Sequence, residues 1–151
     1  MSDSKMYEKA VSDPAKELLE MFSKSIDPKV RAGVAQNPNT PEGVLDRLSH
    51  DTDAAVRIGV ASNPSSSAKV LWQLAHDRDP YVRYQIARNP SVTAEISEFL
   101  SDDESDDVRM GVATNPNTLK EVLDKLSEDR SVLVKLAARH NIETNADMLR
   151  R

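Results

Sequence analysis

Aspartate and arginine recur at a fixed distance in this chain, and they are the residues best suited to chemistry. Each of three aspartates precedes an arginine by six residues: Asp51 and Arg57, Asp77 and Arg83, Asp103 and Arg109. A row of carboxylates could act in acid–base catalysis, and a stripe of guanidinium groups could bind phosphate. Because every arginine has a carboxylate at matched spacing, little positive charge is left for phosphate. We therefore predict a structural ladder, in which each aspartate accepts hydrogen bonds from its own unit's arginine and from the next one's.

A second polar column consists of asparagines that lie 26 residues apart, at Asn63, Asn89 and Asn115. An asparagine side chain can satisfy backbone groups where a helix ends and tolerates left-handed backbone geometry. A catalytic site is normally needed once, so repetition of the same residue argues against catalysis. We predict that these asparagines form a buried structural row between neighbouring units.

Other arrangements that could hold a metal or a substrate fail on spacing or composition. His50 and His76 share a column, but stacked helices stand about 8–10 Å apart, far more than the reach of one zinc ion. The acidic run from Asp102 to Asp107 lacks the glycine and the later glutamate of a calcium-binding loop. The chain has no cysteine, no glycine-rich phosphate loop and no hydrolase or zinc-protease motif. The sequence therefore predicts no catalytic residue, no metal, no cofactor and no enzyme activity.

These columns belong to a repeat with a period of 26 residues, marked by valines at 30, 56, 82, 108 and 134. A fixed period of this length indicates a stacked array of supersecondary units. Within a unit, Val44, Leu45 and Leu48 form the apolar stripe of a first helix, and a second helix follows from about 54 to 62. Glycines at 33, 59 and 111 weaken that second helix, which indicates close backbone approach and a helix that is short or partly 3₁₀.

The predicted fold is an all-α solenoid of two-helix repeats in which each unit contacts only its neighbours. We expect an N-terminal tail or cap at 1–13 and a repeat array over 14–142. The array divides into a partial repeat at 14–38 and repeats at 39–64, 65–90, 91–116 and 117–142. A truncated C-terminal repeat or cap follows at 143–151.

Recognition in such an array depends on positions that vary while the frame is constant. Tyr81, Tyr84 and Arg88 have i, i+3, i+7 spacing and share one helical face. Tyrosine and arginine are enriched at binding hot spots. Ile58 and Met110 flank Tyr84 from the neighbouring units, and their column is either part of a contact surface or another core layer. We predict that a protein or peptide partner binds along this second-helix surface.

Trp72 occupies a column whose other members are acidic residues. It is therefore a candidate for an exposed tryptophan on the first-helix side, as a second contact patch or a self-association site. Partial burial against the aliphatic stems of Lys69 or Gln73 is the alternative. The sequence does not decide between these interpretations.

Charge and hydropathy indicate which classes of partner and which cellular compartment to expect. The formal net charge is −5, whereas nucleic-acid binders usually show a basic balance or a basic stripe. No apolar run approaches the roughly 18 residues of a membrane span, and the first residues have no apolar signal-peptide core. These features predict a soluble cytoplasmic protein with no membrane contact and argue against a nucleic-acid ligand.

The recurring pattern Asn-Pro-x-Thr/Ser…Val-Leu-x-x-Leu-x-x-Asp-x-Asp-x-x-Val-Arg-x-x-Val-Ala resembles the leucine-rich repeat variant family from about Pro14 to Arg150. It is also similar to HEAT-type repeats. The resemblance implies a right-handed superhelix of paired helices, the second often 3₁₀ in character, and it brings no catalytic residues. HEAT-like DNA glycosylases use aromatic residues on a concave helical surface. Tyr81, Tyr84, Arg83 and Arg88 leave a DNA-binding or repair-type module as the alternative function.

Overall fold

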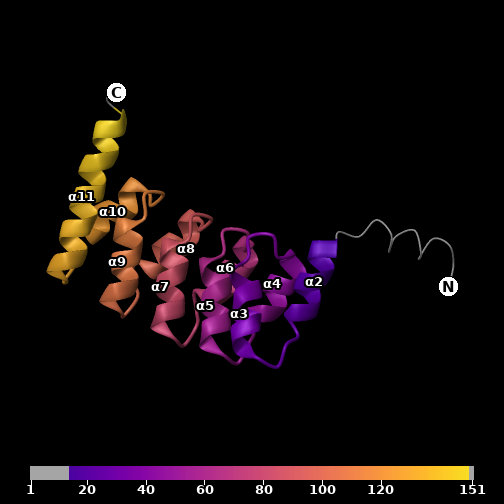
Figure 1. Ribbon diagram of the computed structural model, residues 1–151. Helices are drawn as coiled ribbons and strands as arrows, with labels where there is room; N and C mark the ends of the chain where they lie inside the picture. The colour runs from indigo at the N-terminus through magenta and orange to yellow at the C-terminus, as the bar shows by residue number, and fades with distance from the viewer. Residues whose placement is uncertain (1–13, 150–151) are drawn as a thin grey trace, which may run out of the picture.

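The computed structural model describes residues 14–149. This part of the chain consists of helices joined by short turns and contains no strand. The helices stack in chain order into an elongated array, with α2 at one end and α11 at the other (Figure 1). Their bounds are α2 Pro14–Phe22, α3 Pro28–Gln36, α4 Glu42–Leu48, α5 Ala54–Ser62, α6 Ala68–Leu74, α7 Pro80–Arg88, α8 Ala94–Leu100, α9 Asp106–Thr114, α10 Lys120–Leu126 and α11 Val132–Leu149. The predicted all-α solenoid is confirmed. The tail or cap expected at 1–13 lies outside the described residues.

Each unit pairs a short first helix with a slightly longer second helix. The first helices α4, α6, α8 and α10 have 7 residues each. The second helices α3, α5, α7 and α9 have 9 residues and are α-helical throughout. Of the two expected alternatives, short or partly 3₁₀, the second helix is short and α-helical. The last helix, α11, runs for 18 residues and continues through residues 142 and 143, where the sequence places the start of the C-terminal cap.

Short polar residues fix where the second helices begin. The Asp53 carboxylate accepts a hydrogen bond from the Ala55 N–H at 2.8 Å at the start of α5. Asp27 and Asp79 cap α3 and α7 in the same way, and each is followed by a proline. An N-cap carboxylate satisfies an N–H that lacks a partner within the helix, and proline fits the first helical position. The sequence thereby sets where the second helix begins in these three units.

One continuous apolar seam runs through the array. The first helices contribute residues such as Leu45 and Leu71, which have no exposed surface. The second helices contribute Val56, Val82 and Val108, which are likewise fully buried. Because each unit buries only a few small aliphatic side chains, its stability comes from the neighbours that cover them.

The backbones of successive second helices approach one another closely, whereas successive first helices stand further apart and meet through side chains. Glycine permits this approach: a Cβ at Gly59 would stand 2.8 Å from the Ala35 Cβ, and one at Gly111 would stand 2.9 Å from the Ala87 Cβ. The expectation of close backbone approach is confirmed at these two glycines. It is wrong for Gly33, around which a Cβ would meet nothing within 4 Å. The array is therefore tighter on its second-helix side.

Candidate interaction surface

The predicted aspartate and arginine columns meet in bidentate ion pairs, but each pair joins two different units. Arg57 Nε donates to Asp77 Oδ2 at 2.8 Å, twenty residues further along the chain. Equivalent pairs join Arg31 to Asp51 at 2.7 Å, Arg83 to Asp103 at 2.7 Å and Arg109 to Asp129 at 2.9 Å. The prediction has each aspartate accept from its own unit's arginine and from the next one's, but the carboxylate accepts from the arginine of the preceding unit.

Within its own unit, each arginine contacts the aspartate backbone instead. Arg57 Nη1 donates to the Asp51 carbonyl oxygen at 2.9 Å, and Arg83 Nη1 donates to the Asp77 carbonyl oxygen at 2.8 Å. One guanidinium therefore joins a turn of its own unit to a carboxylate of the next. The hydrogen bond to Asp77 raises the pKa of Arg57 against the opposing effect of burial. These buried, fully engaged arginines are not available to bind phosphate.

The asparagine column joins the opposite ends of the second helices. The Asn89 Nδ2 donates to the carbonyl oxygens of Ala61 at 2.7 Å and Asn63 at 3.0 Å, both in the preceding unit. Its Oδ1 accepts from the Ser91 N–H at 2.8 Å, within its own turn. Asn63 and Asn115 make the equivalent bonds. Each side chain thus satisfies three backbone groups at once.

A groove opens where α7 lies against α9, and it contains most of the residues that the sequence predicts for partner binding. Its volume is about 450 Å³, and its lining includes Tyr81, Tyr84, Arg88, Asp107 and Met110. Tyr81 is 54% exposed as a residue, and its ring stacks on that of Tyr84 with centroids 5.8 Å apart. The Arg88 guanidinium lies over the Tyr84 ring, 5.4 Å from its centroid. The three residues therefore form one preassembled surface.

The column on either side of Tyr84 is neither fully exposed nor fully buried. Ile58 on α5 and Met110 on α9 are partly buried and pack against the core cluster, as Tyr84 does. Met110 lines the groove, whereas Ile58 does not. A Cβ at Gly111 would stand 3.3 Å from Tyr84 Cδ2, so the Tyr84 ring also covers the glycine of the next unit. Tyr84 is consequently both a groove residue and a packing residue.

Trp72 lies on a different surface, on first helix α6, and it is 38% exposed. Its ring contacts Phe99 on α8 at a centroid distance of 5.3 Å and His76 at 5.0 Å. His76 and Phe99 are themselves 4.5 Å apart, so the three rings form one cluster. The repeat pattern does not indicate Phe99, because Phe99 stands in a different column from Trp72 and the contact is diagonal between helices. The one sign of this contact in the sequence is that Phe99 is an aromatic residue in a column that is polar in the other full repeats.

Other kinds of site are not supported by the described part of the chain. Within residues 14–149, no three histidine, aspartate or glutamate side chains come together in a way that could hold a metal ion. None of the helices in this range is both long enough and apolar enough to cross a bilayer. The acidic turn that includes Asp102 and Asp103 engages in ion pairs with Lys125 and Arg83.

Comparison with known proteins identifies the repeat unit. Residues 28–53 match the family model of the leucine rich repeat variant. This segment is one period long and takes in α3, α4 and the N-cap of α5. No curated protein and no solved structure matches the chain. The matched segment is one unit of the helical array that the structure describes.

Proposed function

We propose that the protein is a non-catalytic scaffold that binds a protein or peptide partner in the groove formed by Tyr81, Tyr84, Arg88 and Met110. The observation that supports this most strongly is the stacked pair of Tyr81 and Tyr84 with the Arg88 guanidinium over it. These side chains are held in place before any partner arrives, which lowers the entropy cost of binding. Solvent-exposed aromatic surface of this kind is typical of binding hot spots.

The groove offers distinct contacts at its two ends. Arg88 is exposed at the C-terminal end of α7, and Asp107 is exposed in the first turn of α9. The tyrosine rings and Met110 supply apolar surface between them. An extended peptide that carries an apolar side chain between charged groups fits this arrangement. The acidic residue also disfavours phosphate in the same groove.

A peptide-display selection tests this function. The full-length protein is used as bait for a random peptide library, beside the variant Tyr81→Ala/Arg88→Ala. We chose Tyr81 because Tyr84 also packs on Gly111, so its removal would confound folding with binding. We expect enriched peptides whose binding falls at least about tenfold in the double variant, equivalent to about 1.4 kcal/mol.

Two controls make this result specific. The variant Trp72→Ala lies on the first-helix surface and should retain the enriched peptides. Melting temperatures should agree within a few degrees between the wild-type protein and the groove variant. Peptides that bind the groove variant as well as the wild-type protein would refute the assignment of this surface.

The alternative function, a DNA-binding or glycosylase-like module, is less well supported. Arg83 is buried and paired with Asp103, which leaves Arg88 as the arginine in the groove. Asp106 and Asp107 place negative charge at the start of α9. A fluorescence-anisotropy titration with duplex DNA at low salt discriminates the two functions, because backbone binding is strongest there. Saturable binding that Arg88→Ala weakens would favour this alternative.

A further inference from the structure

Neighbouring first helices are joined by a column of side-chain hydrogen bonds. A donor on one first helix reaches a serine hydroxyl at the end of the preceding first helix, 24 residues earlier in the chain. The pairs are Arg47 with Ser23, Gln73 with Ser49 and Lys125 with Ser101. At the α6–α8 junction both members differ, because Phe99 stands in the donor column and Ala75 in the serine column. A polar link that the other described junctions share is therefore replaced here by apolar side chains.

The rings at this junction form an exposed surface, which we call the aromatic patch. It consists of Trp72, His76 and Phe99, whose rings are in mutual contact. Phe99 is 41% exposed and Trp72 is 38% exposed, although Ala75 beneath them is fully buried. His76 Nδ1 donates to the Trp72 carbonyl oxygen at 2.9 Å, which holds the imidazole against the other two rings. Because the other junctions close without aromatic residues, this exposed and preassembled surface indicates an interaction site.

Carboxylates on α8 set the charge around the aromatic patch. Glu95 stands one helical turn before Phe99, and Glu98 occupies the column of Trp72. Both glutamates are exposed, and within residues 14–149 neither has an ion-pair partner. The lysines on α6 and α10 are engaged by other carboxylates, Lys69 by Asp46 at 3.5 Å and Lys125 by Asp102 at 2.6 Å. Two uncompensated negative charges therefore flank the exposed rings.

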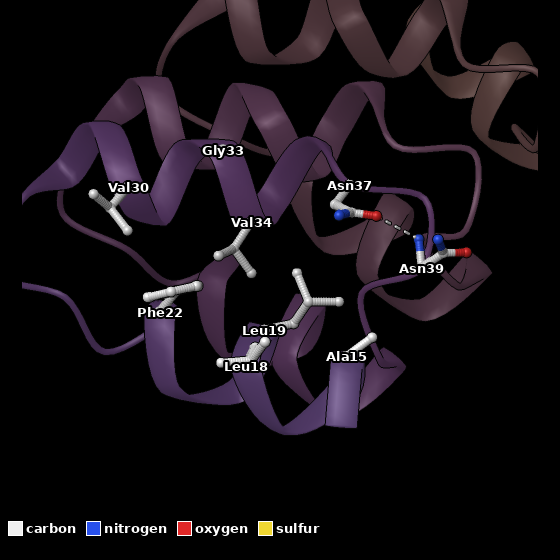
Figure 2. A pocket seen from close by; sticks show the side chains of 9 residues that line it. All are labelled: Ala15, Leu18, Leu19, Phe22, Val30, Gly33, Val34, Asn37 and Asn39. Atoms are coloured by element: carbon white, nitrogen blue, oxygen red, sulfur yellow. Dashed lines mark hydrogen bonds between the residues drawn. The ribbon is translucent and has the colours of Figure 1, made fainter. Parts of the chain in front are cut away.

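The apolar pocket between α2 and α3 lacks this second feature (Figure 2). Its volume is about 400 Å³, and Leu18, Phe22 and Val30 are among the residues that line it. None of the described residues in its lining is charged. Apolar contact alone fits many occupants, whereas the carboxylates beside the aromatic patch specify the charge of the partner.

From these features we propose that the aromatic patch binds a basic segment of a partner protein. An apolar side chain of that segment covers the rings of Trp72 and Phe99, and lysine or arginine side chains beside it pair with Glu95 and Glu98. A cation at this place is attracted both by a carboxylate and by the face of an aromatic ring. The same carboxylates repel phosphate groups, which disfavours nucleic acid and anionic lipid. The patch is separate from the tyrosine groove, so the proposal does not depend on the proposed function.

Charge also separates this partner from two other occupants. A second copy of the chain is disfavoured because its formal net charge is −5 and a symmetric contact would bring Glu95 and Glu98 of both copies together. Residues 1–13 of the same chain, which lie outside the described part, contain three acidic residues and two lysines. Neither occupant brings the excess of positive charge that complements the patch.

The direct test uses Trp72, the only tryptophan in the chain, as its own reporter. A random peptide library without tryptophan is selected on the full-length protein and counter-selected on the variant Trp72→Ala. We expect the selected peptides to carry an apolar residue between lysines or arginines. Their saturable binding should shift the Trp72 emission to shorter wavelength, because the indole loses contact with water. The variant Glu95→Gln/Glu98→Gln should bind at least about tenfold more weakly, and added salt should weaken binding to the wild-type protein.

Matched controls separate this surface from its surroundings. Glu121→Gln/Asp124→Asn removes two exposed carboxylates at the equivalent positions of α10, and it should bind the selected peptides as the wild-type protein does. The groove variant Tyr81→Ala/Arg88→Ala should bind them equally well. Because all four acidic positions are exposed, neither acidic double variant should change the melting temperature by more than a few degrees.

Three outcomes would overturn the proposal. The first is a selection that yields no peptide dependent on Trp72, or peptides without an excess of basic residues. The second is a dimer seen by sedimentation and abolished by Trp72→Ala, which would identify a second copy as the occupant. The third is a shift of the Trp72 emission to longer wavelength in the free full-length variant Lys5→Glu/Lys9→Glu, which would identify residues 1–13.

Discussion

The two ends of the second helices are joined to their neighbours by different chemistry. At the N-terminal ends, rungs such as Arg57 with Asp77 are charged and bidentate. At the C-terminal ends, rungs such as Asn89 with the Ala61 and Asn63 carbonyls are neutral. We call these the arginine edge and the asparagine edge. Both edges are buried, yet only the arginine edge changes its charge state with pH.

The difference shows what a repeat array demands of each edge. The asparagine rung satisfies two carbonyl oxygens and one N–H with a single side chain, so no other residue type replaces it without loss. The arginine rung makes more contacts but relies on two charges that must stay paired when buried. We therefore expect the asparagine edge to be the less tolerant of substitution and the arginine edge to be the more sensitive to solution conditions.

The largest effect is expected at the asparagine edge, for Asn89→Asp. The carboxylate cannot donate, and it would face two carbonyl oxygens in a buried position, so the free energy of unfolding should fall by about 4 kcal/mol. Urea unfolding monitored by circular dichroism measures this loss. The control Asn39→Asp, at an exposed position, should change stability by less than about 0.5 kcal/mol. Equal stability of the two variants would contradict the asparagine edge as described.

At the arginine edge, Arg83→Ala should cost about 3 kcal/mol, because it leaves the Asp103 carboxylate buried without its cation. Adding Asp103→Ala to this variant should recover part of the loss, since it removes the unpaired charge. The same unfolding measurement gives the coupling between the two side chains. Arg78→Ala, at an exposed arginine, is the matched control. Independent, additive losses would show that this rung is not a pair.

Between the two edges, Gly111→Ala should destabilise the protein by about 2 kcal/mol. The new methyl group would stand 2.9 Å from the Ala87 Cβ and would push α9 from α7. Gly43→Ala, where space is open, should instead stabilise by up to about 1 kcal/mol through helix propensity. A melting temperature below that of the wild-type protein for Gly111→Ala and above it for Gly43→Ala would support this. A stable Gly111→Ala protein would show that the helices have room to separate.

The smallest effect is the pH response of the arginine edge. The Arg31 hydrogen bond lowers the pKa of Asp51. At Asp129, burial raises the pKa, but hydrogen bonds from Arg109 and the Ser131 N–H outweigh it and leave a lowered pKa. A lowered folded pKa stabilises the protein above the unfolded value of about 3.9 and loses that stabilisation as pH falls through the folded value.

We therefore expect the urea midpoint to be constant near neutral pH and to fall from about pH 5 downwards. In the variant Asp51→Asn, the free energy of unfolding should fall less on acidification, by up to about 1 kcal/mol, because one carboxyl group with a lowered pKa has been removed. Asp124→Asn, on the exposed surface, should follow the wild-type curve. A wild-type midpoint that rises on acidification would contradict the assignment of these carboxylates.

Periodicity predicted much of this architecture because each unit repeats the same apolar pattern. The positions of Asp51 and Arg57 indicated a ladder, but spacing along the chain cannot say that the carboxylate partner lies in the next unit. Gly33 has the same sequence context as Gly59, yet within residues 14–149 no second helix precedes α3 to press against it. The contact between Trp72 and Phe99 is diagonal and depends on how far α6 stands from α8. Such features follow from the stacking geometry, which single columns do not contain.

One column has a mechanical consequence for the whole array. Gln85 occupies the glycine column on α7, and α7 lies less closely against α5 than α5 does against α3. The α9–α11 junction, with Ala137 in the same column, is about as loose as the α5–α7 junction, whereas the two junctions with glycine are drawn tight. Bending under load would concentrate at these two looser junctions. The tyrosine groove lies at the tight α7–α9 junction between them, so its width would be preserved while the array bends.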